Sequence, residues 1–204
     1  MFITLEGPDG SGKTQQIHLL ADFLTEKGYK VFFSREPGGT EIGDQIRTIL
    51  MDLKNTKMNP RTETLLFCAS RAQIVEEVIK PKLKKGYIVI LDRYADSTLA
   101  YQGYGHGNDL QTLRTLLDFA TAGLKPDLTI LLDLDPELGL NRRKKGGGEW
   151  NRMDAYRLEL HKRVREGYRE MASREPQRWR IISADQPIEV VQSELRNLIL
   201  DYLE

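Results

Sequence analysis

A glycine-rich segment close to the start of the chain constrains the fold more than any other part of the sequence. Residues 7–14 read Gly-Pro-Asp-Gly-Ser-Gly-Lys-Thr, which fits the pattern G-x-x-x-x-G-K-[ST]. A short apolar run, 2–6, precedes them, and apolar residues at helical spacing follow them. A strand, a loop and a helix in this order form the setting in which backbone amides close around phosphate oxygens. The sequence therefore predicts a phosphate-binding loop and a nucleoside triphosphate ligand.

The residues of this loop have separate expected tasks. Glycine tolerates positive φ and has no side chain, so the backbone can turn tightly and approach a phosphate closely. Lys13 is expected to reach the β- and γ-phosphates, and the Thr14 hydroxyl is expected to ligate Mg²⁺. The residues assigned to triphosphate binding are Gly7, Pro8, Asp9, Gly10, Ser11, Gly12, Lys13 and Thr14.

Five β-rich runs recur along the chain, with helical patterns between them. The runs are 2–6, 30–34, 87–92, 128–133 and 179–183, and most are continuously apolar, which is typical of parallel strands covered on both faces. The helical patterns are 15–27, 42–53, 62–84, 109–122, 136–145, 154–173 and 188–203, and Pro81 is expected to bend or break the third. This alternation predicts an α/β fold of the P-loop NTPase type, a five-stranded parallel sheet with helices on both faces. Because no linker rich in Pro, Gly or Ser divides the chain, residues 1–204 are expected to form a single domain.

Polar residues that follow the strands should meet at one edge of the sheet, where ligands of such folds bind. Asp92 ends the third apolar run, at the position where a carboxylate holds Mg²⁺, and Arg93 beside it could neutralise a phosphoryl group. The alternative for Asp92 is a carboxylate that caps the following turn. Asp133 ends the fourth run, and there the turn role is favoured.

Arginines are spread along the same predicted edge, at Arg35, Arg47, Arg71 and Arg93. Guanidinium groups match phosphate oxygens in pairs of hydrogen bonds, so several together predict a site for a second phosphate. Each alone could equally be a surface residue in an ion pair. Phe67 lies four residues before Arg71 and therefore on the same helix face, where it could stack on a base or belong to the core.

A basic helix end followed by three glycines suggests a mobile lid at about residues 142–153. A lid of this kind brings positive charge onto a reacting phosphate and excludes water. Its candidate cations are Arg142, Arg143, Lys145 and Arg152. The alternative is an exposed loop with a solvated run of charges.

The composition of the chain limits the classes of partner and the cellular location that we expect. Thirty basic and thirty acidic residues cancel, so net charge does not favour nucleic acid or an anionic membrane as a partner. The single cysteine, Cys68, excludes an internal disulfide and is expected to be a small buried side chain. No apolar run approaches the ~20 residues of a membrane helix, and we expect no signal peptide and a cytoplasmic location. His106 and His161 are expected at the surface.

Several stretches together make the chain similar to the thymidylate kinase family over nearly its whole length. They are 6–14, 35–40 (Arg-Glu-Pro-Gly-Gly-Thr), 66–71, Asp92-Arg93-Tyr94 with Ser97, Ala100-Tyr101-Gln102-Gly103, and 126–129. Many protein families share the phosphate loop. The second stretch, followed in this order by Asp-Arg-Tyr and Ala-Tyr-Gln-Gly, is typical of far fewer families. The resemblance implies Mg²⁺-dependent transfer of the γ-phosphoryl of ATP to dTMP, giving dTDP for dTTP synthesis, by a homodimer.

The resemblance also implies roles for individual residues. Phe67 would stack on thymine, and Tyr101 would close against the deoxyribose and disfavour a 2′-hydroxyl. The catalytic residues would be Lys13, Arg93 and Asp9, and the metal ligands Thr14 and Asp92. The residues expected to bind dTMP are Glu36, Pro37, Arg47, Phe67, Arg71, Arg93, Ser97, Thr98, Tyr101 and Gln102. The apolar faces of 62–79 or 109–122 could supply the dimer contact.

One stretch departs from the family pattern. Relatives without an arginine in the phosphate loop usually carry one in the lid, a few residues before an Asp-Arg or Asn-Arg pair. Counting back from Asn151 and Arg152, this chain has Gly147 and Gly148 there. The alternatives to a dTMP kinase are a kinase for another acceptor, a nucleotide-dependent switch and an inactive relative that binds dTMP. No Asn-Lys-x-Asp segment of a GTP-binding switch is present.

Overall fold

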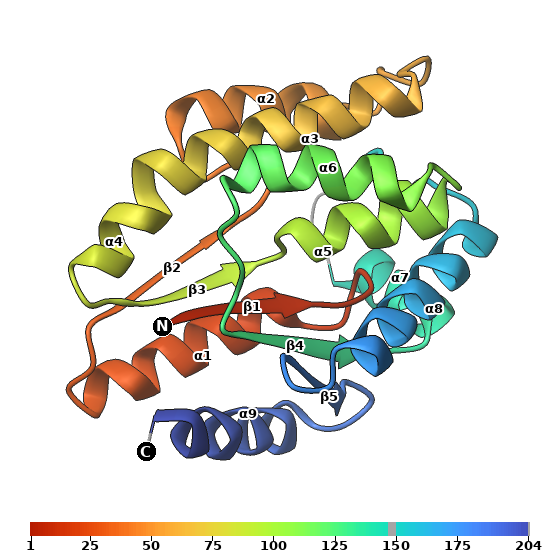
Figure 1. Ribbon diagram of the computed structural model, residues 1–204. Coiled ribbons are helices and arrows are strands. Elements are labelled where there is room, and N and C mark those ends of the chain that lie inside the picture. The colour runs from red at the N-terminus through yellow and green to blue at the C-terminus, as the bar shows by residue number, and fades with distance from the viewer. Residues whose placement is uncertain (147–149, 204) are drawn as a thin grey trace.

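The computed structural model describes residues 1–146 and 150–203. Within this part of the chain, five strands form one parallel sheet in the order β2-β3-β1-β4-β5 (Figure 1). The strands are β1 (Phe2–Glu6), β2 (Val31–Arg35), β3 (Ile88–Asp92), β4 (Leu128–Asp133) and β5 (Trp179–Ser183). Each bound lies within one residue of the run predicted from the sequence, so the predicted α/β sheet is confirmed.

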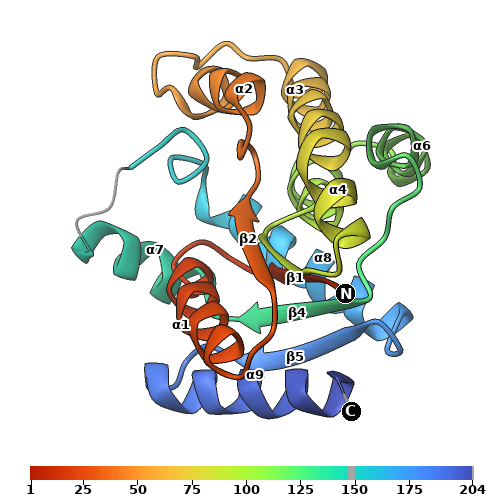
Figure 2. The ribbon, with the colours of Figure 1, turned by 90° about the vertical axis from the view of Figure 1, so that its left-hand side faces the viewer.

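The helices cover both faces of this sheet. They are α1 (Lys13–Glu26), α2 (Glu41–Met51), α3 (Pro60–Ile74), α4 (Lys80–Lys84), α5 (Ala95–Thr98), α6 (Leu110–Thr121), α7 (Pro136–Lys145), α8 (Leu158–Arg174) and α9 (Ile188–Leu203), with π-helical segments η1 (Val75–Ile79) and η2 (Leu99–Gly105). Helices α1 and α9 lie against one face, while α3, α6 and α8 lie over the other (Figures 1 and 2). Side-chain caps begin several of them, as where the Asp109 carboxylate accepts the Thr112 amide at 2.7 Å.

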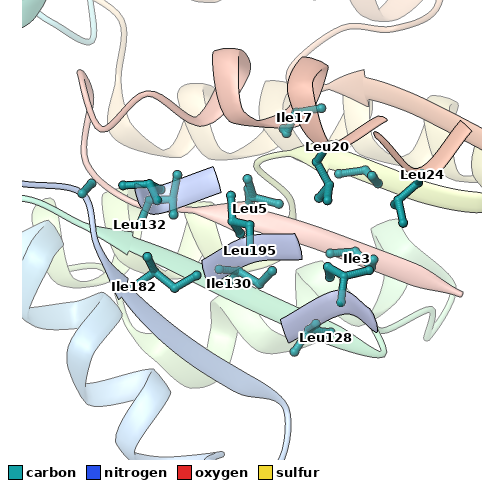
Figure 3. Close-up of a cluster of buried hydrophobic side chains, with 14 of the residues drawn as sticks. Ile3, Leu5, Ile17, Leu20, Leu24, Leu128, Ile130, Leu132, Ile182 and Leu195 are labelled. Carbon is teal, nitrogen blue, oxygen red and sulfur yellow. The ribbon is translucent and has the colours of Figure 1, made fainter. Parts of the chain in front are cut away.

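Alternate residues of each strand enter cores on opposite faces. Ile3 and Leu5 pack with Leu20 and Leu24 of α1 and with α9 (Figure 3), whereas Phe2 packs on the other face against η1. Burying one such leucine or isoleucine contributes about 2 kcal/mol. Because α1 is held in this way on β1, the phosphate loop between them has a fixed position.

The topology brings the polar strand ends together. Strand β1 is flanked by β3 and β4. From β1 the chain first goes to β2 and β3 on one side and then crosses to β4 and β5 on the other, which makes a switch point of the kind that binds ligands. In the register, Asp92 lies opposite Leu5 on one side and Arg35 on the other. The loops after β1, β2 and β3 therefore open at one edge of the sheet.

Two local predictions need correction. The bend or break expected at Pro81 is displaced: the chain stays helical through the proline to Lys84, and the interruption of the α-helix is the π-helical segment η1, which ends at Ile79. The segment 95–105 was not predicted to be helical, and its glycines explain why. A Cβ on Gly103 would lie 2.5 Å from Leu110, so this segment needs small residues for packing and lacks an apolar period.

None of the helices in residues 1–146 and 150–203 has the length and apolarity needed to cross a bilayer.

Candidate active site

The phosphate loop has the backbone that its glycines permit. Gly7, Gly10 and Gly12 have φ values of 141°, 79° and 85°, and Gly12 caps the start of α1. A Cβ on Gly10 would lie 2.1 Å from the carbonyl oxygen of Gly139 in α7, and a Cβ on Gly139 would lie 2.2 Å from the carbonyl oxygen of Asp9. The loop therefore packs directly on the backbone of α7, where any side chain would displace it.

Lys13 is folded back over this loop. Its Nζ donates to the carbonyl oxygens of Gly7 and Pro8, at 3.1 and 2.9 Å, and to the hydroxyl of Ser11 at 3.2 Å. Burial, together with the positive charge of Arg93, lowers the pKa of Lys13 to about 8. The free protein thus holds a poorly compensated ammonium group where an anion would relieve it.

The two predicted metal ligands meet. The Thr14 hydroxyl donates to Oδ2 of Asp92 at 2.5 Å, although 78 residues separate them in the sequence. Both groups present oxygen, the ligand that Mg²⁺ prefers. Asp133, the second strand-end carboxylate, is instead paired with Arg165 and Arg169 of α8, at 2.8 and 2.7 Å.

Arg93 is the centre of a second charged group. Its Nη2 donates to Asp9 at 2.7 Å and to the Tyr101 hydroxyl at 3.1 Å, and its Nη1 donates to the hydroxyls of Ser97 and Tyr168. The Asp9 carboxylate also accepts from the Tyr101 hydroxyl at 2.7 Å. Arg93 has φ of +71°, a conformation that costs about 1 kcal/mol or more in a non-glycine residue. Such strain persists only where neighbours hold it, and here it aims the guanidinium at Asp9.

Electrostatics keep Asp9 ionised. Burial alone would raise its pKa, but the charges of Arg93 and Lys13 and the hydrogen bond from Tyr101 outweigh burial and lower it well below the usual value. The carboxylate is therefore a fixed acceptor between two cations.

Sequence reasoning missed Glu6, which holds two of the hydroxyl groups that bind Arg93. The Glu6 carboxylate accepts from the Tyr94 amide, the Ser97 hydroxyl and the Tyr168 hydroxyl, at 2.8, 2.6 and 3.1 Å. Burial, with the nearby charge of Asp96, raises the pKa of Glu6 to about 7. The one available signal was a glutamate inside an otherwise apolar strand. Tyr168 gave no signal, because it is 162 residues away along the chain.

A cavity of about 570 Å³ joins these groups. From the phosphate loop it is lined by Asp9, Gly10, Gly12, Lys13 and Thr14, and from the end of β3 by Asp92 and Arg93. Of the ten residues predicted to bind dTMP, nine line it: Glu36, Pro37, Arg47, Phe67, Arg93, Ser97, Thr98, Tyr101 and Gln102. Phe67 also packs on the core beside α8, so its position is compatible with both of the roles expected for it.

Arg71 is the exception among the ten. It is 1 % exposed, and it is absent from the cavity lining within the described residues. Its Nη2 lies 2.7 Å from Glu36, and it also donates to the Thr98 hydroxyl and the Tyr94 carbonyl oxygen. Arg71 thus braces the wall that Glu36 and Thr98 present to the cavity.

The lid cations separate into two pairs. Arg142 and Arg143 line the cavity, and their guanidinium groups pair with Asp185 and Asp154. Lys145 is exposed and lies outside the lining. Arg152 is 7 % exposed and pairs at 2.6 Å with Glu63, away from this cavity. Residues 147–149, where the family pattern expects the lid arginine, lie outside the described residues.

The remaining predictions on single residues gave mixed results. Cys68 is buried, as predicted. The prediction for His161 is wrong: its side chain is 2 % exposed, in α8. His106 is half-buried, with Nε2 3.4 Å from Glu63. Histidines of this kind look like surface residues in a sequence, because their buried contacts come from distant segments.

Comparison with known proteins identifies the family. The profile of the thymidylate kinase family matches residues 5–195. A thymidylate kinase of Roseiflexus castenholzii is 51% identical, covering 100% of this chain and 94% of that protein, and one of Thermomicrobium roseum is 52% identical, covering 93% and 90%. The crystal structure of thymidylate kinase from Ehrlichia chaffeensis superposes with a TM-score of 0.80 at 36% identity, covering 98% of both chains. Since the profile spans most of the chain and these relatives span nearly all of it, the chain belongs to the thymidylate kinase family.

Proposed function

We propose that this enzyme transfers the γ-phosphoryl group of ATP to the phosphate of dTMP, with release of dTDP and ADP. One observation carries the proposal: a single cavity is lined both by the phosphate loop, at Lys13 and Thr14, and by Phe67 and Gln102. A donor and an acceptor nucleotide held in one cavity can react directly, so no covalent intermediate on the protein is needed. The product dTDP leads to dTTP.

The phosphate loop binds the donor. Its amides and the start of α1 face the β- and γ-phosphates, and Lys13 moves from its loop carbonyls to these oxygens. Thr14 and Asp92 would hold Mg²⁺, which would neutralise charge on the phosphates. Their oxygens already meet in a hydrogen bond, so both side chains point to the same place.

The Arg93 group binds the acceptor. Arg93 and Arg47, which both line the cavity, hold the dTMP phosphate, and Asp9 orients Arg93 and Tyr101 beside the sugar. Phe67 stacks on the base. Tyr101 is 4 % exposed and is fixed by Asp9 and Arg93, so there is little room for a 2′-hydroxyl.

The reaction itself requires little from acids or bases. A dTMP phosphate oxygen, already ionised near neutral pH, attacks the γ-phosphorus; the new P–O bond forms as the bond to the β-bridging oxygen breaks, and the electron pair leaves with ADP. Two nucleotide phosphates repel each other, so the rate depends on cations placed between them: Lys13, Arg93 and the lid arginines. Of the lid candidates we assign this role to Arg142 and Arg143, because both line the cavity.

An acceptor screen tests the proposed function. ADP formation is measured with ATP and Mg²⁺ and, separately, dTMP, dUMP, dCMP, dGMP or AMP. We expect turnover with dTMP and weaker turnover with dUMP. Turnover that ignores the acceptor would indicate a nucleotide-dependent switch, and binding of dTMP without turnover would indicate an inactive relative.

Phe67→Ala distinguishes base stacking from core packing. We expect the KM for dTMP to rise about tenfold or more, since stacking on an aromatic ring contributes about 1–3 kcal/mol per base. The KM for ATP, measured on the same variant, should change little. Equal increases in both KM values would assign Phe67 to the core alone.

We also propose that the enzyme is a homodimer that packs through α3 and α6. These helices lie side by side (Figure 1), and each exposes a large apolar side chain: Leu65 is 55 % exposed and Phe119 is 87 % exposed. Phe119→Asp should therefore shift the mass in sedimentation toward one chain of 23.4 kDa. Ile188→Asp, an exposed apolar position on α9, is the matched control and should leave the mass unchanged. The cytoplasmic location stays a prediction.

A further inference from the structure

Glu63 of α3 is the centre of a buried polar cluster behind the acceptor side of the cavity. It is 1 % exposed. Its Oε1 accepts from Nε2 of Gln102 at 2.7 Å, and its Oε2 accepts from the Tyr156 hydroxyl and lies 2.6 Å from Nη2 of Arg152. Nε2 of His106 lies 3.4 Å from Oε1. Four side chains from two segments distant from α3 in sequence, 102–106 and 152–156, thus meet at one carboxylate.

This carboxylate is ionised. Burial would raise its pKa, but the nearby His106 imidazole, the hydrogen bond from Tyr156 and the charge of Arg152 lower it to about 2. An ionised carboxylate has no proton to donate and only accepts hydrogen bonds. Of the two ends of the Gln102 carboxamide, only the NH₂ end can therefore hydrogen-bond to it.

The orientation of Gln102 follows from this. The two ends of a carboxamide are nearly equal in shape, so packing alone does not choose between them. Glu63 fixes the orientation of the carboxamide, because its carboxylate accepts a hydrogen bond from the NH₂ group. Gln102 also lines the cavity, and its backbone is held by Asn108, whose side chain donates to the Gln102 carbonyl oxygen at 2.8 Å. Because Glu63 occupies the NH₂ end, the carboxamide oxygen is the end that remains for a ligand in the cavity.

An acceptor in this place can make a hydrogen bond with only one group on a thymine ring. Thymine linked to a sugar has a single N–H, at N3, and carbonyl oxygens on either side. Cytosine has no hydrogen at N3, where it presents a lone pair. A carboxamide oxygen fixed toward N3 therefore attracts thymine and repels cytosine, whereas a carboxamide free to turn would accept both.

We propose that Glu63 is a positioning residue that sets acceptor specificity by locking Gln102 with its oxygen toward the base, so that bases with an N3–H are accepted and cytosine is rejected. The inference rests on the proposed dTMP kinase activity. Glu63 acts entirely through Gln102, because Glu63 is absent from the cavity lining within the described residues. The specificity of the pocket would then depend on a residue that no ligand touches.

Glu63→Gln tests the proposal. The new amide can either accept from or donate to Gln102, so Gln102 can turn. We expect the ratio of kcat/KM for dTMP over dCMP to fall about tenfold or more, because an unpaired or repelling polar contact is replaced by a satisfied one. The ratio for dTMP over dUMP should not change, because both bases carry N3–H. This second ratio separates loss of the lock from general loosening of the pocket.

Two further variants keep the test decisive. Glu63→Gln leaves the Arg152 charge buried without a partner, which lowers the melting temperature. The double variant E63Q/R152Q removes both charges together and should show the same loss of discrimination if the single variant folds poorly. Tyr156→Phe removes another Glu63 partner without touching Gln102, so it should keep the dTMP preference of the unmodified enzyme.

The outcomes separate the inference from the function on which it rests. If the unmodified enzyme does not turn over dTMP, the proposed function fails. If it does, and E63Q and E63Q/R152Q lower kcat/KM for dTMP and dCMP by the same factor, Glu63 is a structural residue and the inference is wrong. A falling dTMP-to-dCMP ratio in Tyr156→Phe would also overturn it, because that change leaves the lock in place.

Discussion

Lys13→Ala is expected to lower kcat by about a thousandfold, the scale for removing a cation that stabilises a transferring phosphoryl group. Its melting temperature should change by no more than a few degrees. Burial and the charge of Arg93 lower the pKa of Lys13 to about 8, which means that the folded protein disfavours the charged ammonium. Removing this ammonium group therefore removes an unfavourable buried charge from the folded state, while it also removes the cation needed for phosphoryl transfer. ADP formation and a circular dichroism melt give the two readouts.

The control for this variant is Lys27→Ala, which removes an exposed ammonium at the other end of α1. It should retain both rate and melting temperature. If Lys13→Ala keeps its rate at ordinary ATP concentrations, the assignment of the phosphate loop is refuted. A large fall in melting temperature would instead show that the three hydrogen bonds of Lys13 to its own loop hold the fold together.

The sheet and the phosphate loop were predictable because their signals are local. Parallel strands covered on both faces are mostly apolar along their length, so the strand runs could be read directly, and a glycine pattern with Lys13 and Thr14 fixes the loop after the first of them. The rule that ligands lie at the carboxyl ends of the strands then placed Asp92 near Thr14, across 78 residues.

Pairings between distant segments were not predictable in the same way. The spacing of Phe67 and Arg71 put both on one helix face, but only the fold shows that Glu36 takes the Arg71 guanidinium at 2.7 Å. Arg152 likewise looked like a lid cation, and the fold pairs it with Glu63 instead. A buried charge must find a partner, and the sequence does not say which of thirty candidates of opposite sign it will meet.

The second large effect is expected at Arg93, whose neighbours all serve to hold it. Asp9 and Tyr101 bind one side of its guanidinium, Ser97 and Tyr168 bind the other, and the last two in turn rest on Glu6. The positive φ of Arg93 adds strain that these contacts offset. Because its guanidinium is held on both sides, Arg93 presents its charge without a further loss of side-chain entropy when the substrate binds. This fixed charge stabilises the transition state better than a freely rotating side chain would.

Arg93→Gln should therefore lower kcat/KM for dTMP by about a hundredfold to a thousandfold and raise the KM for dTMP more than that for ATP. Part of this loss comes through Asp9, because the pKa of its carboxyl group rises once the charge of Arg93 is removed. The control is Arg178→Gln, which breaks a comparable buried pair with Asp96, at 2.6 and 3.0 Å, outside the cavity lining of the described residues. It should lower the melting temperature and leave kcat/KM nearly unchanged. If the two variants lose activity equally, Arg93 contributes only to stability, and the acceptor phosphate must be held elsewhere.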